Sequence, residues 1–160
     1  MGSHGIKDQV AIVGMGCTRF AEHWDKGADL LAVEAVNDAF VSAGVDKTSV
    51  DAYWLGTALS GASGMMLSKP LELSGQPVVR VENMCATGAE SLRQAAYAVA
   101  CGAYDVAAAV GVEKAKDSAI RVSTPSRSRT TVRPVRSRRP PCSPWRCRPT
   151  PTSTASTRRR

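Results

Sequence analysis

The sequence has few of the residues from which metal sites are built. It holds two histidines, His4 and His23, and five cysteines, and no two cysteines are separated by only two residues. Structural zinc sites use four cysteine or histidine ligands, usually with two of them that closely spaced. We therefore expect no metal ion in this protein.

Long apolar runs are also absent. No run approaches the ~20 apolar residues that cross a bilayer, and the first residues lack the basic and apolar segments of a secretory signal. We therefore expect no membrane partner and no export. Free cysteines are typical of a reducing compartment, so we place the protein in the cytoplasm.

Acidic residues, lysine and glycine are missing from residues 119–160. That segment holds 12 of the 21 Lys and Arg residues, all of them arginine, and 7 of the 9 prolines. The residues before it hold nine basic and fourteen acidic side chains. A segment rich in like charge and proline buries too little apolar surface to fold alone. We therefore divide the chain into a folded segment, residues 6–118, and a disordered basic tail, residues 119–160.

The folded segment alternates between two kinds of apolar pattern. Short β-branched runs predict strands, and longer stretches with apolar residues on one side predict helices that end at Gly44 and Gly102. Such alternation is typical of a mostly parallel sheet with helices on both faces, so we predict the α/β class. The predicted strands are residues 10–16, 52–57, 78–83 and 106–115, and the predicted helices are residues 29–43 and 86–101, with a shorter helical piece at 65–71.

Cys85 differs from the other cysteines in its position. A cysteine in such a domain most often fills space in the core, and we assign that role to Cys17 and Cys101. Cys85 instead follows a predicted strand directly and precedes a helix, where the helix dipole and unpaired N–H groups favour a thiolate. The small residues 86–88 would let a carbonyl approach, and their N–H groups would help to bind its oxygen. From the residues alone, a nucleophile and a packing cysteine both remain open for Cys85.

Two stretches of the folded segment carry a family resemblance. They are VAIVGMGCTRF, residues 10–20, and VVRVENMCATGAESLRQAAYAVACGAYDVAAAVGVEKAKDS, residues 78–118. Together they resemble the N-terminal half of a thiolase, of the sterol-carrier-protein-x or lipid-transfer-protein branch. The resemblance covers about residues 8–118. Its most specific part is Asn83-x-Cys85-x-x-Gly88, followed by an alanine-rich helix and an apolar strand that ends in GVEK.

The resemblance implies a thiolase-like, layered α/β/α N-terminal domain, here incomplete, with Cys85 as the nucleophile. In the family, that cysteine takes the acyl group from a 3-ketoacyl-CoA and passes it to coenzyme A. An acyl-CoA is then the substrate, coenzyme A is a co-substrate, and no cofactor stays bound. The resemblance also implies a homodimer for the full-length protein, with residues 78–83 near the interface. The acid–base groups of the family lie in the C-terminal half, and neither His4 nor His23 lies in a matching motif.

Three other functions stay open. Some relatives are retro-aldolases that act on sterol side-chain CoA esters with a small partner protein, and Cys85 would then carry no acyl group. A non-enzymatic lipid-transfer or interaction protein would bind its ligand without Cys85. A nucleic-acid-binding module would use the arginines of the tail. Because Trp145 is the only aromatic residue there for stacking on bases, we do not expect a nucleic-acid partner.

The composition of the tail has a second explanation. Arg, Pro, Ser and Thr in bulk are what a GC-rich gene encodes when it is read out of frame. A shift of one base just before residue 119 can restore peptides that continue the thiolase pattern. We therefore expect that the reading frame is lost at Ser118/Ala119, which would make this chain a truncated thiolase with little or no activity of its own.

Overall fold

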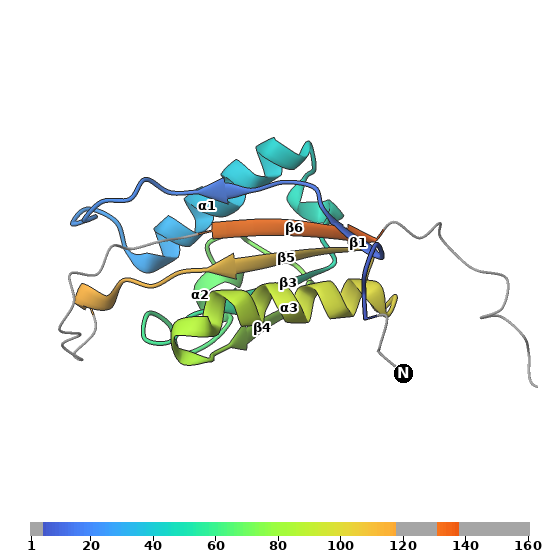
Figure 1. The fold of residues 1–160 in the computed structure, drawn as a ribbon. Coiled ribbons are helices and arrows are strands. Elements are labelled where there is room, and N and C mark those ends of the chain that lie inside the picture. Colours follow the sequence, from blue (N-terminus) through green and yellow to red (C-terminus); the bar gives the residue numbers. More distant parts are fainter. Residues whose placement is uncertain (1–4, 118–130, 138–160) are drawn as a thin grey trace, which may run out of the picture.

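The computed structural model describes residues 5–117 and 131–137, which fold into three layers (Figure 1). A sheet forms the middle layer and helices cover both of its faces, so the predicted α/β class is confirmed. The strands are β1 (Val10–Ile12), β2 (Gly16–Cys17), β3 (Ala52–Gly56), β4 (Val78–Val81), β5 (Val106–Gly111) and β6 (Thr131–Ser137). The helices are α1 (Ala28–Ala43), α2 (Met65–Ser68) and α3 (Thr87–Ala100), with 3-10 turns η1 (Lys47–Ser49), η2 (Met84–Ala86) and η3 (Ala115–Asp117).

The strands lie in the order β1-β6-β5-β3-β4, and β2 also pairs with β6. β3 is parallel to β4 and β5, as the alternation of strands and helices predicts, whereas β6 is antiparallel to β1, β2 and β5. The sheet is therefore mixed. β6 belongs to the segment that we expected to form a disordered tail, so the structure differs from that expectation at residues 131–137. The other residues of that segment lie outside the described part of the chain.

The side chains of β3 divide the core into two halves. Tyr53 and Leu55 pack with α1 and α2, while Ala52 and Trp54 pack on the side of α3. Successive side chains of a strand point to opposite faces. A strand that is apolar at every position therefore needs a cover on both sides, and α1 and α3 supply it (Figure 1).

The first predicted strand is interrupted because the chain passes very close to α1. A Cβ on Gly14 would lie 2.8 Å from the Ala39 carbonyl oxygen, and one on Gly16 would lie 2.5 Å from the Ala39 nitrogen. Between β1 and β2, the Met15 N–H donates to the Ser42 hydroxyl at 3.3 Å instead of to a strand. Helix α1 therefore takes over part of the backbone pairing that we predicted for a continuous strand at residues 10–16.

Helix α1 is the longest helix in the described residues, with 16 residues. A helix that crosses a bilayer needs about 20 apolar residues. No helix in the described ranges reaches that combination of length and apolar character.

Candidate active site

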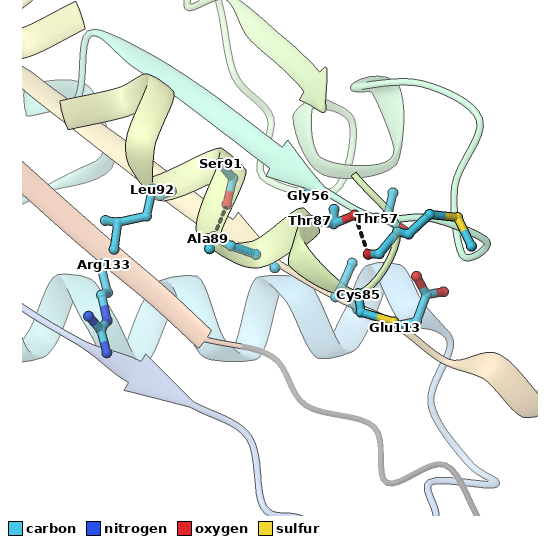
Figure 2. Close-up of a pocket in the computed structure, with 14 residues that line it drawn as sticks. Gly56, Thr57, Cys85, Thr87, Ala89, Ser91, Leu92, Glu113 and Arg133 are labelled. Atoms are coloured by element: carbon cyan, nitrogen blue, oxygen red, sulfur yellow. Dashed lines mark hydrogen bonds between the residues drawn. The ribbon is translucent and has the colours of Figure 1, made fainter. Parts of the chain in front are cut away.

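Cys85 lies in the turn η2, between the end of β4 and the start of α3. The parallel strands β3, β4 and β5 all end at this edge of the sheet, and the ends of β3 and β5 border a cavity of about 550 Å³. Figure 2 shows Cys85 at the start of α3, with residues of β3, β5 and β6 along the same cavity. The residues that line it include Gly56, Thr57, Cys85, Gly88, Glu113 and Arg133.

The three cysteines of the described segment are all free and exposed, so the space-filling role that we assigned to Cys17 and Cys101 is wrong. The Cys101 thiol donates to the Ala98 carbonyl oxygen at 3.2 Å, which also accepts the Ala103 N–H at 3.0 Å. The Cys17 thiol donates to the carbonyl oxygen of the next residue at 3.3 Å. Within the described residues, the Cys85 thiol makes no such bond and faces the cavity, which distinguishes it from the other two.

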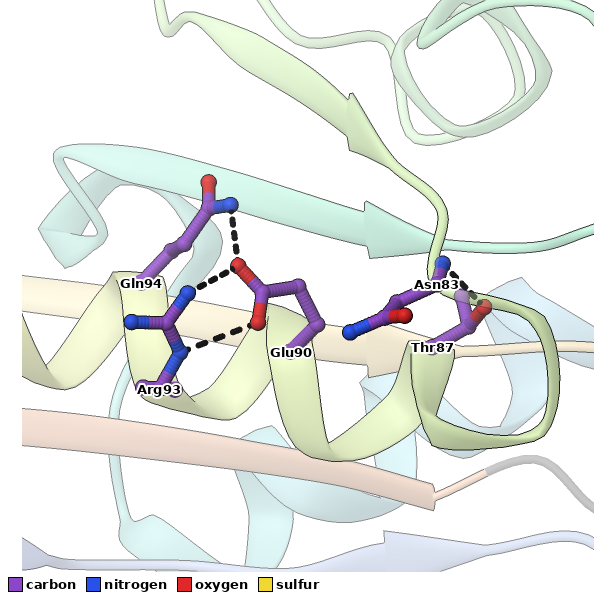
Figure 3. Close-up of polar contacts among 5 residues, drawn as sticks. All are labelled: Asn83, Thr87, Glu90, Arg93 and Gln94. Carbon is purple, nitrogen blue, oxygen red and sulfur yellow. Dashed lines mark hydrogen bonds and ion pairs between the residues drawn. The ribbon is translucent and has the colours of Figure 1, made fainter.

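The turn that carries Cys85 has an unusual backbone. Met84 has a φ of 46°, in the left-handed region that non-glycine residues rarely adopt. The Thr87 hydroxyl accepts a hydrogen bond from the Asn83 N–H at 2.8 Å and donates one to the Met84 carbonyl oxygen at 2.7 Å. The Glu82 carboxylate accepts the Met84 N–H at 2.5 Å. Figure 3 shows Thr87 below Asn83, with its hydroxyl directed at Asn83.

Two of the N–H groups that we expected to bind a carbonyl oxygen are already occupied. The Ala86 N–H donates to the Asn83 carbonyl oxygen at 2.9 Å, and the Thr87 N–H donates to that of Met84. The expectation for these two residues is therefore wrong, because the 3-10 turn uses their N–H groups internally. The expectation of open space is correct, since a Cβ on Gly88 would meet no atom within 4 Å.

Glu90, on the first turn of α3, is bonded by side chains of its own helix. Its carboxylate accepts two hydrogen bonds from Arg93, at 2.6 and 2.9 Å, and one from Gln94 at 2.6 Å (Figure 3). The bonds from Arg93, and then that from Gln94, hold the pKa of the Glu90 carboxyl below its ordinary value. This carboxylate therefore stays ionised and structural.

Glu113 borders the cavity at the end of β5 but directs its carboxylate to the loop after β3. It accepts the N–H of Ala58 at 2.7 Å, the N–H of Leu59 at 3.2 Å and the Ser60 hydroxyl at 2.6 Å. On the other side of the loop, Arg80 of β4 donates to the carbonyl oxygens of residues 57, 58 and 61. Two opposite charges, Arg80 in β4 and Glu113 just after β5, thus hold from both sides the loop that follows β3 and borders the cavity.

Sequence reasoning found Cys85 but missed Thr87, Arg80 and Glu113. The motif GVEK contains Glu113, and its position just after an apolar strand was a usable signal. The roles of the other two depend on hydrogen bonds to backbone atoms, which no residue pattern displays. In the described ranges, no three His, Cys, Asp or Glu side chains gather as a metal site requires.

The family model of the thiolase N-terminal domain matches residues 10–138. Over 114 residues the chain is 38% identical to an acetyl-CoA acetyltransferase of Methanocaldococcus jannaschii, and over 113 residues it is 32% identical to sterol carrier protein 2 of Gallus gallus. Each alignment covers 68% of this chain, but only 29% of the first relative and 21% of the second. The chain therefore spans less than a third of the length of these relatives.

Solved structures share the fold at lower identity. They include the priming β-ketosynthase of the R1128 polyketide pathway and the 3-oxoacyl-(acyl-carrier-protein) synthase III of Aquifex aeolicus, each with a TM-score of 0.68. Their identities are 16% and 15%, and the matches cover 81% of this chain and 50% and 55% of theirs. At such identities the likeness shows the fold alone, and it confirms the predicted layered architecture.

Proposed function

The chain belongs to the thiolase family of acyltransferases, and from that membership we propose that Cys85 is the nucleophile of an acyl transfer. The acyl donor is a 3-ketoacyl-CoA, and coenzyme A is the second substrate. The Cys85 thiolate attacks the 3-keto carbon. The bond between carbons 2 and 3 breaks, its electron pair and a proton go to carbon 2, and a shortened acyl-CoA leaves. The thiol of coenzyme A then takes the acyl group and regenerates Cys85.

One observation carries this proposal. Of the three cysteines in the described residues, Cys85 is the one that borders the cavity and whose thiol makes no hydrogen bond there. It sits on a strand–turn–helix junction, where a nucleophile is held by rigid elements and is exposed at the end of a parallel strand. A thiol that merely filled space would be buried among apolar neighbours.

We assign the oxyanion donor of the turn to the N–H of Cys85 itself. The N–H groups of the other turn residues already have acceptors, namely those of Asn83, Met84, Ala86 and Thr87. A carbonyl carbon attacked by the thiol brings its oxygen close to the N–H of the same residue. Donors aimed at that oxygen stabilise the negative charge that develops on it.

The test is to treat the purified chain with acetyl-CoA and with a 3-ketoacyl-CoA, and to locate the acyl group by peptide mass spectrometry. We expect it on Cys85 and not on Cys17 or Cys101, which are exposed thiols of the same molecule and serve as internal controls. The Cys85→Ser variant should carry no thioester at this position. An acyl group spread evenly over the three cysteines would contradict the proposal.

The acylation experiment also separates a retro-aldolase from a thiolase, and two binding measurements separate the remaining functions. A retro-aldolase would leave Cys85 free of acyl groups while cleaving a sterol side-chain CoA ester. A lipid-transfer protein would retain ligand binding in Cys85→Ala, and a nucleic-acid-binding module would bind with a steep salt dependence. The likeness to sterol carrier protein 2 supports a branched or sterol side-chain acyl group as the substrate. We propose lipid degradation in the cytoplasm as the process.

We further propose that the full-length protein is a homodimer that associates through β4. This strand lies at one end of the described sheet, with β3 as its neighbour there, and Val79 is 42% exposed. An edge strand presents unpaired N–H and C=O groups to a second chain. Sedimentation velocity on the wild type and on Val79→Lys tests the proposal, and an unchanged dimer in the variant would contradict it.

We also propose that the reading frame is lost at Ser118/Ala119 and that this chain is a truncated thiolase with little or no turnover, so that the acylation experiment tests only the attack by Cys85. The absence of acidic residues after that point supports the idea. The nucleotide sequence across codons 115–122 tests the frame. Turnover of a 3-ketoacyl-CoA by the 160-residue chain at an ordinary enzymatic rate would contradict the predicted inactivity.

A further inference from the structure

We propose that Thr87 is a positioning residue for Cys85, a role that rests on the proposed function of Cys85 as the nucleophile. Thr87 does not touch the substrate in this proposal. Its hydroxyl fixes the backbone turn from which both the Cys85 thiol and the Cys85 N–H project. The geometry of that turn, and not the cysteine alone, then determines whether a carbonyl can be attacked and its oxygen held at the same time.

The hydroxyl bridges the two ends of the residue pair that precedes Cys85. It accepts the Asn83 N–H at 2.8 Å and donates to the Met84 carbonyl oxygen at 2.7 Å. A hydroxyl can accept and donate at once, so one side chain satisfies both groups. The two bonds hold Asn83 and Met84 in a single arrangement, and they do so from within the first residue of α3.

The bridged residue is the strained one. Met84 has a φ of 46°, and a side chain in that region is unfavourable unless its surroundings hold it there. Its own side chain is 74% exposed, so packing of that side chain cannot supply the restraint. The Glu82 carboxylate that accepts the Met84 N–H is also exposed. Thr87 is 6% exposed and is therefore the buried anchor of the turn.

The methyl group of Thr87 fixes the direction of its hydroxyl. A Cβ on Gly56 would lie 3.1 Å from the Thr87 Cγ2 and 3.0 Å from its carbonyl oxygen, so the end of β3 packs directly against this residue. The absence of a side chain at Gly56 makes room for that contact. The end of β3 thereby orients Thr87, and Thr87 orients the turn.

The experiment compares the full chain with three variants. Thr87→Val keeps the shape and removes both hydrogen bonds, and Thr87→Ser keeps the hydroxyl. Thr48→Val is the matched control, because it removes a threonine hydroxyl from another 3-10 turn, where that hydroxyl donates to Asp46 at 2.8 Å. For each protein we would measure acylation by acetyl-CoA and alkylation by iodoacetamide at Cys85, Cys17 and Cys101.

We expect Thr87→Val to lower acylation of Cys85 about tenfold to a hundredfold, the range that corresponds to two lost hydrogen bonds. Alkylation of Cys85 needs only access and should change less than about threefold, because iodoacetamide requires no oxyanion donor. Thr87→Ser should restore acylation, and Thr48→Val should leave it unchanged. Equal losses of acylation and alkylation, or faster alkylation at all three cysteines, would mean general unfolding and would overturn the inference.

Amide hydrogen exchange keeps this inference separate from the proposed function. Thr87→Val should speed exchange at residues 83 and 84 about tenfold, while Thr87→Ser retains the wild-type rate. If acetyl-CoA labels no cysteine in the wild type, the acyl-transfer proposal fails, and the exchange result still decides whether Thr87 holds the turn. Unchanged exchange in Thr87→Val would overturn the inference even if Cys85 is acylated.

Discussion

Tyr53 is the largest of the fully buried side chains in the described residues, and it places a phenol in the core. Its hydroxyl donates to the Lys47 carbonyl oxygen at 3.3 Å. Burial, and to a lesser degree the negative charge of Asp46, raises the pKa of Tyr53 well above its ordinary value. The phenolate is therefore the form that the folded protein excludes.

The first prediction concerns the pH dependence of stability that follows from Tyr53. Because the folded pKa is raised, the neutral phenol stabilises the fold fully below the unfolded pKa of about 10, and this contribution is lost as the pH rises toward the folded pKa. Between pH 9 and pH 11 we expect the free energy of unfolding to fall more in the wild type than in Tyr53→Phe. Urea unfolding across that range measures it. Tyr97→Phe is the control, since Tyr97 is 48% exposed, and a Tyr53→Phe curve parallel to the wild type would contradict the prediction.

At the level of single residues, the sequence identified Cys85 because its place between a strand and a helix is visible in the residue pattern. It could not identify Thr87, whose role depends on two backbone groups, or the φ of Met84, which no propensity predicts for methionine. The exposure of Cys17 was missed because we applied the general tendency of cysteine toward burial. In the structure Cys17 lies in a strand of two residues, and its N–H donates to the Asp38 carboxylate of α1.

Among the larger elements, the loop of residues 57–61 depends most on charged side chains. Glu113 accepts the N–H groups on one side of this loop, and Arg80 donates to the carbonyl oxygens on the other. Within the described residues, Arg80 and Glu113 form no ion pair with each other, so both charged groups bind the loop instead. We therefore expect the loop to unfold locally when either charge is removed.

The second prediction tests this loop with Glu113→Ala. The variant leaves the Ala58 and Leu59 N–H groups and the Ser60 hydroxyl without their acceptor, so we expect a loss of about 2–3 kcal/mol in the free energy of unfolding. Urea denaturation provides the measurement. Glu34→Ala serves as the control, because it breaks an exposed ion pair with Lys26 and should change stability little. Equal effects of the two substitutions would contradict the prediction.

The third prediction concerns the close approach of β2 to α1. A methyl group on Gly16 would lie 2.5 Å from the Ala39 nitrogen and 2.9 Å from the Asp38 Cβ, so Gly16→Ala must push the strand away from the helix. We expect Gly16→Ala to lower the free energy of unfolding by about 1–3 kcal/mol, the usual cost of overpacking. Gly88→Ala is the matched control, since nothing lies within 4 Å and alanine favours a helix. The midpoint temperatures of thermal unfolding should shift in opposite directions in the two variants. A stabilised Gly16→Ala would refute the packing argument.

At the scale of the whole molecule, the sequence predicted the layers but not the order of the strands. The layers follow from apolar runs such as residues 106–111, which need a cover on both faces. The order β1-β6-β5-β3-β4 depends on β6, and that strand lies among arginines and prolines that indicate no strand. No local sequence pattern could therefore predict which strand pairs with β1.

The last prediction tests how far the fold depends on β6. This strand separates β1 from β5, and it is the only described partner of β1 and β2 in the sheet. A chain that ends at residue 130 leaves the backbone groups of β1 unpaired and opens an edge on β5. We expect it to aggregate or to lose a cooperative urea transition, measured by the fluorescence of Trp54 and Trp24. A chain that ends at residue 138 keeps β6 and should unfold as the full chain does. If the shorter chain also unfolds cooperatively with the same midpoint, then β6 contributes no stability, and the segment before it folds on β3, β4 and β5 alone.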